Sequence, residues 1–307
     1  MRSIKQKSGI TIKYLKMPKI SPKPSWLNKR IVLGSCHKVK SILRDLSLHS
    51  VCEESSCPNI SECFQEGVAT FMILGDTCTR ECTFCGVNKG QPYSIDYDEP
   101  RRIKEAVERL KLNYVVITSP TRDDLCDGGA DLFCQTVEAI MGLGSKRIVE
   151  ILIPDFKGKA ELIEKVARSR AKVISHNLET PASLYKKVRR GAVYERSLEV
   201  LRLVKKVNKK VFTKSGLILG LGEEEEEVIQ ALLDLRSVDC DLLTLGQYLP
   251  PSLKHYPLKD YVLPDKFAYF QEYAQKIGFR GVKSAPYVRS SYLAHSLLEP
   301  NCCSNYT

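Results

Sequence analysis

The chain has 307 residues, of which 43% are hydrophobic, and a formal net charge of +11. This length is sufficient for a sizeable core in one large or two modest domains. No apolar run approaches the ~20 residues that span a membrane, and no compact apolar segment near the N-terminus indicates a secretory signal. Twelve cysteines in a long chain without such a signal favour metal ligation in a reducing compartment over a disulfide framework.

The positive charge is concentrated near the N-terminus, where no Asp or Glu precedes Asp45. Residues 1–25 are expected to form a flexible basic arm, because Pro18, Pro22 and Pro24 interrupt any helix there. A solvated arm is the simplest interpretation, and steering of an acidic protein partner is the next. No motif that combines aromatic and basic residues indicates nucleic-acid binding.

A first cysteine triplet lies in a polar segment, residues 38–66, for which we predict mostly irregular structure. Cys52, Cys57 and Cys63, the first triplet, have the spacing C-x4-C-x5-C. Thiolate sulfur is the ligand that iron–sulfur clusters use, normally four per cubane, so three cysteines leave one iron without a thiolate. An iron short of a protein ligand can bind another group, and chemistry can occur there.

A second triplet follows the first predicted strand. Residues 69–75 form an apolar run that Gly and Asp terminate, which indicates a buried strand. Cys78, Cys82 and Cys85, the second triplet, come directly after it with the spacing C-x3-C-x2-C, and Phe84 precedes the last cysteine. A structural zinc site prefers four ligands in two closely spaced pairs, so we favour a cluster over zinc.

Strands and helices alternate through the rest of the chain. Strands are predicted at 114–119, 148–153, 172–177, 211–219, 242–245 and 282–285. Helices are predicted at 101–112, 131–143, 159–168, 181–189, 195–207, 223–236, 264–277 and, at the end, 289–298. Six successive strand–helix units without a Gly-x-Gly-x-x-Gly after the first strand favour an α/β fold with a partial (β/α)6 TIM-like barrel.

Polar residues follow several predicted strands, whereas the strand interiors are apolar. They are Ser119, Asn177, Glu179, Ser215 and Gln247. Because chemistry in such barrels lies at the C-terminal ends of the strands, this segregation predicts one active face. The alternative, that polar residues follow strands simply because loops are polar, stays open. A carboxylate such as Glu179 suits a ribose hydroxyl pair or an ammonium group.

The second triplet resembles the signature of the radical S-adenosylmethionine superfamily in its spacing, its aromatic residue and its position after a strand. The resemblance implies that this triplet holds a 4Fe–4S cluster whose remaining iron binds S-adenosylmethionine, and that the reduced cluster generates a 5′-deoxyadenosyl radical. Asn177 and Glu179 then follow the strand where family members contact the cofactor, and Ser119 and Gln247 lie at other strand ends. The alternative is that these four residues merely fix loops.

The first triplet and several stretches across the chain resemble the lipoyl synthase family. The similarity runs from about residue 23 to residue 293 and includes ATFMILGDTCTR at 69–80, TKSGLILGLG at 213–222 and Arg-Ser-Ser-Tyr at 289–292. It implies that the first triplet holds an auxiliary 4Fe–4S cluster with Ser291 as its fourth ligand. A serine oxygen is a weaker partner for such iron than a thiolate, which suits a cluster that is consumed as a sulfur donor.

The activity that this resemblance implies is sulfur transfer: insertion of sulfur at carbons 6 and 8 of an octanoyl chain, using two S-adenosylmethionine molecules and the two clusters. The octanoyl chain would be linked to a lysine of a lipoyl-carrier domain, either a 2-oxoacid dehydrogenase E2 subunit or the glycine-cleavage H protein. Aliphatic C–H bonds are not acidic, so no catalytic histidine–carboxylate pair is required, and we expect His176 to be structural.

The same resemblance implies an electron donor such as flavodoxin or ferredoxin and an iron–sulfur assembly carrier, with no nucleic-acid or membrane partner. We expect three segments: an N-terminal arm and auxiliary-cluster segment (1–66), a barrel core (67–280) and a C-terminal extension (281–307). About 20 residues precede the family-like part, too few for a typical transit peptide, so a cytoplasmic location is expected.

Two alternative functions remain open at this point. One is another radical enzyme with an auxiliary cluster, such as a methylthiolating enzyme, although these have a different N-terminal cysteine pattern and usually an added nucleic-acid-binding domain. The other is a non-catalytic iron–sulfur scaffold or electron carrier. Polar strand ends beside an incomplete cluster site argue against the second.

Overall fold

The computed structural model describes residues 22–29, 36–65 and 68–298. Most of the predicted basic arm, residues 1–21, lies outside the described residues, as do Cys302 and Cys303. None of the helices in the described part of the chain is long and apolar enough to cross a membrane.

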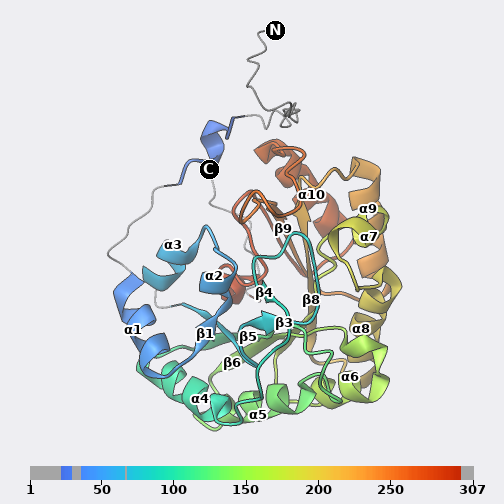
Figure 1. Cartoon of the computed structure of the whole chain (residues 1–307). Coiled ribbons are helices and arrows are strands. Elements are labelled where there is room, and N and C mark those ends of the chain that lie inside the picture. The colour runs from blue at the N-terminus through green and yellow to red at the C-terminus, as the bar shows by residue number, and fades with distance from the viewer. Residues whose placement is uncertain (1–21, 30–35, 66–67, 299–307) are drawn as a thin grey trace, which may run out of the picture.

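A curved sheet of eight strands forms the centre of the molecule, in the order β1-β2-β5-β6-β7-β8-β9-β10 (Figure 1). Every neighbouring pair is parallel except β1 with β2, which is antiparallel. The edge strands β1 and β10 do not pair with each other, so the sheet stays open. The partial barrel predicted from the sequence is therefore confirmed. The strands are β1 (His49–Ser50), β2 (Thr70–Met72), β5 (Tyr114–Thr118), β6 (Ile148–Leu152), β7 (Val173–Ser175), β8 (Phe212–Leu219), β9 (Leu242–Gln247) and β10 (Gly281–Ser284).

Helices follow the strands in alternation and surround the outside of the sheet (Figure 1). They are α4 (Glu99–Arg109), α5 (Ala130–Met141), α6 (Ala160–Ala167), α7 (Tyr185–Val188), α8 (Tyr194–Val207), α9 (Glu225–Ser237) and α10 (Pro264–Lys276). A second, two-stranded sheet pairs β3 (Thr77–Cys78) with β4 (Asn88–Lys89) in parallel and encloses most of the second triplet. Short 3-10 turns, η1 (Ser25–Leu27), η3 (Phe156–Gly158), η4 (Ala182–Leu184) and η5 (Ala294–Leu297), complete the fold.

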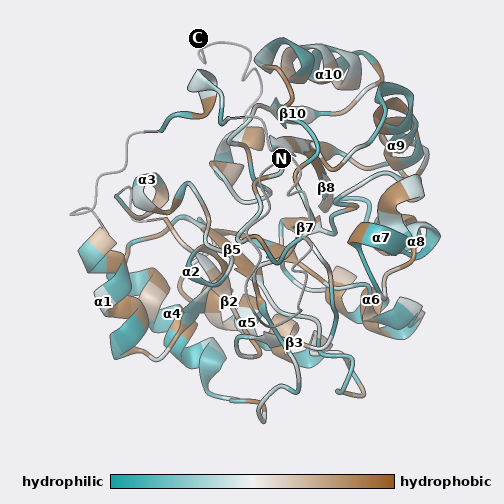
Figure 2. Cartoon of the chain, turned by 45° about the horizontal axis from the view of Figure 1, so that its top comes forward, coloured by the Kyte–Doolittle hydropathy of each residue, from teal (hydrophilic) through white to brown (hydrophobic). Residues whose placement is uncertain are grey.

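The core lies between the sheet and these helices. Strands β2 and β9 are buried along their whole length, as expected for parallel strands covered on both faces. Phe71, Ile151 and Leu243 are examples of fully buried side chains. Burial of each such side chain stabilises the fold by roughly 1.5–3 kcal/mol. Figure 2 shows the outward-facing sides of the helices coloured as hydrophilic and the central strands largely as hydrophobic. This rigid layer supports the strand ends, where the polar residues gather.

The prediction of mostly irregular structure for residues 38–66 is wrong. This segment contains α1 (His37–Asp45), α2 (Val51–Glu54) and α3 (Ile60–Gln65). Helix α1 buries Val39, Ile42 and Leu43 on one face, a helical spacing that the polar composition of the segment obscured. Helices α2 and α3 have only four and six residues, much less than the window of about 11–18 residues in which a helical pattern can be recognised. The Ser50 side chain caps α2 by accepting a hydrogen bond from the amide of Glu53 at 3.3 Å.

The predicted terminal helix at 289–298 is also wrong, because only the 3-10 turn η5 forms there. Leu293 has a positive φ of 47°, which interrupts a right-handed helix. The side chains of Ser290 and Tyr292, just before it, form hydrogen bonds with Asn177 and Glu62, far away in the sequence. Tertiary contacts therefore override the local helical tendency of this segment.

Candidate functional site

A cavity of about 460 Å³ opens at the C-terminal ends of the parallel strands. Its wall contains residues from both triplets, from the predicted strand ends and from the C-terminal segment. They are Cys52, Cys57, Cys78, Cys82, Cys85, Ser119, Asn177, Glu179, Gln247, Ser290 and Ser291. Apolar side chains, among them Met72, Leu152 and Ile218, form much of the remaining wall. The structure thus brings the predicted site residues to one place, except for Cys63, which lines a smaller cavity that shares Cys52 and Cys57.

The second triplet is held in the loop that β3 and β4 enclose. Thr79 anchors the start of this loop, because its amide and its hydroxyl group both donate to the carbonyl oxygen of Thr121 after β5. Cys78 Sγ accepts hydrogen bonds from the amides of Arg80 at 3.4 Å and Thr121 at 3.3 Å. Amide donors stabilise a thiolate, so this sulfur is prepared for a ligand role.

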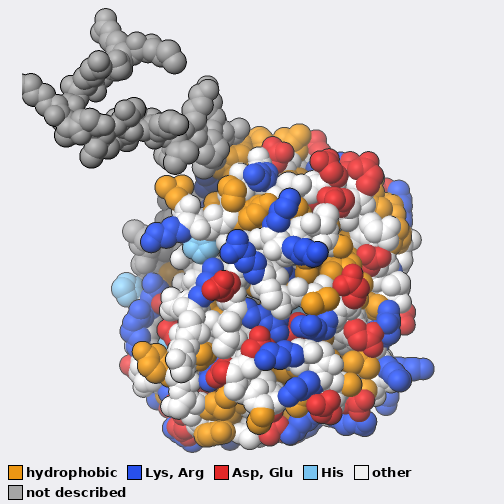
Figure 3. All heavy atoms as spheres, turned by 45° about the vertical axis from the view of Figure 1, so that its right-hand side comes forward, with side chains coloured by type: hydrophobic (Ala, Val, Ile, Leu, Met, Phe, Trp, Pro, Cys, Tyr) orange, Lys and Arg blue, Asp and Glu red, His pale blue; other side chains and the backbone are white. Residues whose placement is uncertain are grey.

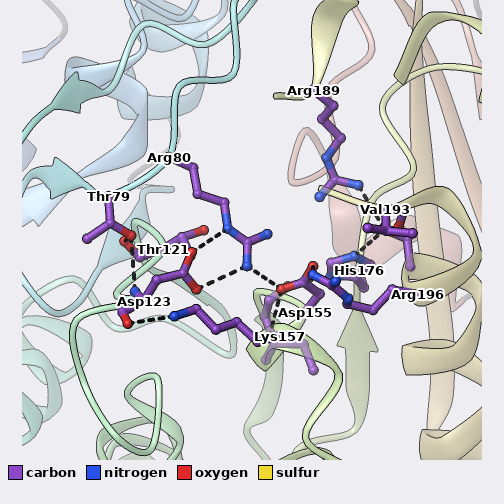
Figure 4. Close-up of polar contacts among 12 residues, drawn as sticks. Thr79, Arg80, Thr121, Asp123, Asp155, Lys157, His176, Arg189, Val193 and Arg196 are labelled. Atoms are coloured by element: carbon purple, nitrogen blue, oxygen red, sulfur yellow. Dashed lines mark hydrogen bonds and ion pairs between the residues drawn. The ribbon is translucent and has the colours of Figure 1, made fainter. Parts of the chain in front are cut away.

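Arg80 stands between the first two cysteines of the second triplet and ties their loop to two neighbouring strand ends (Figure 4). Its guanidinium group donates to both carboxylate oxygens of Asp123, at 2.8 and 3.0 Å, and to Asp155 at 2.5 Å. Asp155 is fully buried and also pairs with Arg196 at 3.2 Å. Burial opposes ionisation of this carboxyl group, but the hydrogen bond and charge of Arg80 hold the pKa of Asp155 well below its usual range. This buried network fixes the position of the loop.

The thiols of the second triplet lie close enough to repel one another when ionised. Burial raises the pKa of Cys85 to about 12, and the charges of Cys82 and Cys78 add to the shift. Burial also raises the pKa of Cys82, an effect that the positive charge of Arg189 partly offsets. Neighbouring thiols with raised pKa values, such as Cys82 and Cys85, ionise together only beside a compensating cation, and iron in a cluster would supply that charge. The donors and electrostatics of this loop therefore fit a 4Fe–4S cluster.

The first triplet lies on two short helices and their connection. Cys52 is on α2, Cys63 is on α3, and Cys57 between them donates its amide to the carbonyl oxygen of Cys52 at 3.0 Å. Burial and repulsion between these thiols raise the pKa of Cys52 to about 11 and that of Cys63 to about 12. Within the described residues, no three Cys, His, Asp or Glu side chains are placed to hold a single metal ion. The three thiols instead surround a cavity.

Ser291 reaches the first triplet from the other end of the chain. Together with all three cysteines, Arg289 and Tyr292, it lines the small cavity of about 20 Å³. Three thiols and one hydroxyl group around this space match the four protein ligands of a cubane. Ser291 also lines the main cavity, so it lies between the two cysteine sites. The residues present thus fit an auxiliary cluster with the predicted ligand set.

Polar side chains after β7 form another part of the main cavity wall. The side-chain amide of Asn177 donates to Glu179 Oε1 at 2.9 Å, and the carbonyl oxygen of Asn177 accepts from Arg189 at 2.7 Å. Burial raises the pKa of Glu179, although Arg189, Asn177 and Arg289 favour its ionised form. Glu179 has a positive φ of 66°, a costly conformation that is frequent at functional sites. This carboxylate is placed to accept hydrogen bonds from hydroxyl or ammonium groups of a ligand.

Ser119 and Gln247, two further predicted cofactor contacts, differ in their hydrogen bonding. Ser119 Oγ is buried at the cavity and has no hydrogen-bond partner among the described residues, so it is available to a ligand. The side-chain amide of Gln247 donates to the carbonyl oxygens of Leu219 and Asp260, at 3.0 Å each, and accepts from the amide of Val262 at 2.8 Å. Gln247 therefore holds a loop in place, and its cofactor contact stays a prediction.

His176 also lines the main cavity, but both of its ring nitrogens are engaged. Nδ1 lies 2.8 Å from the carbonyl oxygen of Ile153, and Nε2 lies 3.0 Å from Ser197 Oγ. Burial, reinforced by the charge of Arg189, lowers the pKa of His176 to about 4, so the ring is neutral near pH 7. The structural role expected from the sequence is confirmed.

Sequence reasoning missed two arginines of the site. Arg80 lies between Cys78 and Cys82, two predicted cluster ligands. A charged residue at that position indicates that a carboxylate pairs with it. Arg189 lies just after α7 and contacts Asn177, Tyr185 and Ser197, but it belongs to no motif that we recognised. Only the fold brings it to the cavity.

Comparisons with known proteins identify two matching family models. The model of the radical SAM superfamily matches residues 72–235. The model of the N-terminal domain of lipoyl synthase of the radical SAM family matches residues 12–57, and so includes the first two cysteines of the first triplet. Both families suggested by the cysteine spacing are therefore found.

Solved structures share the fold at low sequence identity. The crystal structure of HydG, a maturase of the [FeFe]-hydrogenase, has a TM-score of 0.55 at 14% identity, covering 81% of this chain and 63% of that one. Streptococcus suis SuiB bound to S-adenosylmethionine has a TM-score of 0.53 at 15% identity, covering 71% and 51%. These likenesses support the partial barrel alone.

Curated relatives are much more similar in sequence. The lipoyl synthase of Caldicellulosiruptor saccharolyticus is 55% identical over 273 residues, which cover 89% of this chain and 96% of the relative. The lipoyl synthases of Caldicellulosiruptor bescii and Geotalea daltonii are each 51% identical, with 89% and 90% of this chain and 94% of each relative covered. The chain therefore belongs to the lipoyl synthase family within the radical SAM superfamily.

Proposed function

We propose that this chain is a sulfurtransferase that inserts sulfur at carbons 6 and 8 of an octanoyl chain, which a carrier protein presents on a lysine. The observation that carries the proposal is the shared cavity: both cysteine triplets line connected spaces, and Ser291 borders both. Methylthiolation and simple electron transfer, the two alternatives, do not explain this arrangement together with the family membership.

The two triplets divide the cofactors between them. The second triplet would hold the cluster that binds S-adenosylmethionine, and the first triplet with Ser291 would hold the auxiliary cluster. When bound, these groups supply a radical that opens aliphatic C–H bonds and the sulfide that replaces the hydrogen. The protein contributes position: Ser119, Asn177 and Glu179 offer polar contacts for the amino acid or ribose part of S-adenosylmethionine.

The remaining wall of the cavity suits a saturated chain. Met72, Leu152 and Ile218 are apolar and lie between the polar strand ends. Beyond its amide carbonyl, an octanoyl chain has no groups for hydrogen bonding, so apolar contact is its means of binding, and the same contact excludes water from a reactive site. No side chain needs to remove a proton from it.

Ser291 has a second task in this proposal, because the auxiliary cluster has to be held and also given up. A hydroxyl oxygen binds soft iron–sulfur centres more weakly than a thiolate does. Ser291 would therefore hold the auxiliary cluster while leaving it easier to dismantle. A fourth cysteine at this position would retain the iron more strongly. We accordingly propose that segments 1–66 and 281–307 together form the sulfur-donating unit around the barrel core of 67–280.

The partners follow from this chemistry. Figure 3 shows Lys and Arg side chains spread over the middle of one face, and the whole chain has a net charge of +11. We propose that an acidic lipoyl-carrier domain, from a dehydrogenase E2 subunit or the H protein, is attracted by this charge. Flavodoxin or ferredoxin would supply electrons, and an iron–sulfur carrier would restore the auxiliary cluster. Free thiols at every described cysteine suit a reducing cytoplasm.

The direct test uses the anaerobically reconstituted chain. Two cubane clusters predict about eight irons per chain. Addition of S-adenosylmethionine, a reductant and an octanoyl-lysine peptide should release 5′-deoxyadenosine and form the dihydrolipoyl peptide, with loss of cluster sulfide. About four irons per chain, or product formation without loss of cluster sulfide, would contradict the proposal.

A further inference from the structure

Two side-chain hydrogen bonds flank Ser291 and hold its neighbours to opposite sites. Ser290 Oγ donates to Asn177 Oδ1 at 3.2 Å, on the wall of the main cavity. The hydroxyl group of Tyr292 donates to Glu62 Oε1 at 2.7 Å, one residue before Cys63 of the first triplet. Ser291 is thus fixed between two anchors that come from different parts of the fold.

The segment that leads to Ser291 is seated against the sheet. The amide of Gln247 donates to the carbonyl oxygen of Pro286 at 3.0 Å. A Cβ atom at Gly246 would lie 2.0 Å from the carbonyl oxygen of Val288, so glycine is required for this close approach. The backbone before Ser290 therefore has a defined path along the end of β9.

Beyond Ser291, a group of contacts that we call the terminal clasp joins both ends of the chain. It consists of Leu27, Lys29, Asn59, Glu62, Tyr287 and Tyr292. Lys29 Nζ donates to Asn59 Oδ1 at 2.7 Å, forms an ion pair with Glu62, and lies 4.9 and 5.5 Å from the ring centres of Tyr287 and Tyr292. The side-chain amide of Asn59 donates to the carbonyl oxygen of Tyr287 at 2.7 Å, and the hydroxyl group of Tyr287 donates to the carbonyl oxygen of Leu27.

The position of the clasp relates it to the auxiliary site. Asn59 and Glu62 lie in the interval between Cys57 and Cys63, so contacts to these two residues fix the C-terminal segment relative to the first triplet. The Lys29 side chain is 21% exposed, and its pair with Glu62 is partly shielded from water, which strengthens charge-assisted contacts. A weak serine ligand depends on such supporting contacts more than a thiolate does.

We propose that Tyr292 and Lys29 are positioning residues of the terminal clasp, which hold Ser291 against the first triplet, with the Ser290–Asn177 hydrogen bond as the second anchor. This inference rests on the proposed function, in which Ser291 is a cluster ligand. No contact of Lys29 or Tyr292 described above reaches the second triplet. Loss of the clasp therefore weakens retention of the auxiliary cluster and leaves radical generation intact.

The test measures iron release from the anaerobic holoenzyme. S-adenosylmethionine is present to occupy the second-triplet cluster, no reductant is added, and a chelator takes up released iron. Tyr292→Phe removes only the hydroxyl group and keeps the ring over Lys29. We expect it to release iron about tenfold faster than the wild-type chain, the effect of losing one hydrogen bond to a charged group. Tyr269→Phe is the matched control, because Tyr269 is an exposed residue of α10. It should release iron at the wild-type rate.

Three companion variants separate the possible failures. Ser291→Ala should release iron faster than Tyr292→Phe, and Lys29→Met should resemble Tyr292→Phe, while Lys29→Arg restores the charge and much of the retention. If Ser291→Ala is fast but Tyr292→Phe and Lys29→Met match the wild type, the clasp has no positioning role. If Ser291→Ala itself matches the wild type, the ligand assignment in the proposed function fails. Should Tyr292→Phe not fold, Lys29→Met takes its place with the same two outcomes.

Discussion

The two cysteine triplets are stabilised in opposite ways. The second triplet lies within the barrel core, in a loop that follows β2. Contacts with the next two strand ends hold this loop: Thr79 bonds to Thr121, and Arg80 bonds to Asp123 and Asp155. The first is assembled from distant parts of the chain, since its fourth predicted ligand comes from the C-terminal segment and Lys29 joins the contact from the N-terminal side.

The difference corresponds to what each site must do. A cluster that generates radicals repeatedly has to survive every cycle, and a buried ion-pair network within the barrel provides a permanent support. A cluster that is consumed has to be dismantled and rebuilt. In the proposed function, ligation by Ser291, which lies outside the barrel core, would allow this without disturbing the barrel. Three changes are expected to distinguish the sites.

The largest effect is expected from Arg80→Ala. The change leaves the fully buried Asp155 with Arg196 as its remaining ion-pair partner, and breaking a buried pair typically costs about 3–5 kcal/mol of unfolding free energy. After reconstitution, the second triplet should contain less iron than in the wild-type chain, while the iron content of the first triplet should be unchanged. Anaerobic iron analysis, cluster spectroscopy and urea unfolding measure these effects.

Arg101→Ala is the control for that experiment. Arg101 forms ion pairs with Asp98 and Glu105 on the surface of α4, where its side chain is 62% exposed. Solvent screens such exposed pairs, so stability and iron content should change little. Equal iron loss from both triplets in Arg80→Ala would show that the supports of the two sites are not independent.

A smaller effect is expected from Glu179→Gln. The substitution keeps the side-chain size but removes the charge from a carboxylate that Arg189 and Arg289 favour in its ionised form. We expect S-adenosylmethionine to bind about tenfold more weakly, a change of about 1.4 kcal/mol, because a charge-assisted hydrogen bond becomes a neutral one. Calorimetry on the anaerobic holoenzyme measures this affinity.

Glu161→Gln, at an exposed position on α6, is the matched control and should leave the affinity unchanged. The iron content of the first triplet should be the same in both variants. Unaltered S-adenosylmethionine binding by Glu179→Gln would remove this residue from the cofactor site and leave Asn177 and Ser119 as its candidates.

The sequence predicted the partial barrel and the family well because both signals are local. Strand–helix alternation is visible in windows of a dozen residues, and each triplet spans a short stretch. The same local reasoning misassigned residues 38–66, since α2 and α3 are much shorter than the window in which a helical pattern can be recognised. It also could not show that the side-chain amide of Gln247 is bonded to the backbone of Leu219 and Asp260, and the cofactor contact of Gln247 stays a prediction.

The support of Ser291 could not be predicted from spacing alone. Family resemblance indicated the serine, but Ser290 meets a residue 113 positions away and Tyr292 one 230 positions away. Lys29 looked like one of many basic residues near the N-terminus. Its role emerges from a cation–π and ion-pair geometry that only the fold creates.

The most direct test of the division between the two sites is the ratio of two products formed by Ser291→Ala. The anaerobically reconstituted variant is incubated with reductant, S-adenosylmethionine and the octanoyl-lysine peptide, and 5′-deoxyadenosine and dihydrolipoyl peptide are both measured. We expect 5′-deoxyadenosine release near the wild-type rate and dihydrolipoyl formation roughly 100-fold lower, as for loss of a metal-holding contact. An equal fall in both products, or unchanged sulfur insertion, would contradict separate roles for the two triplets.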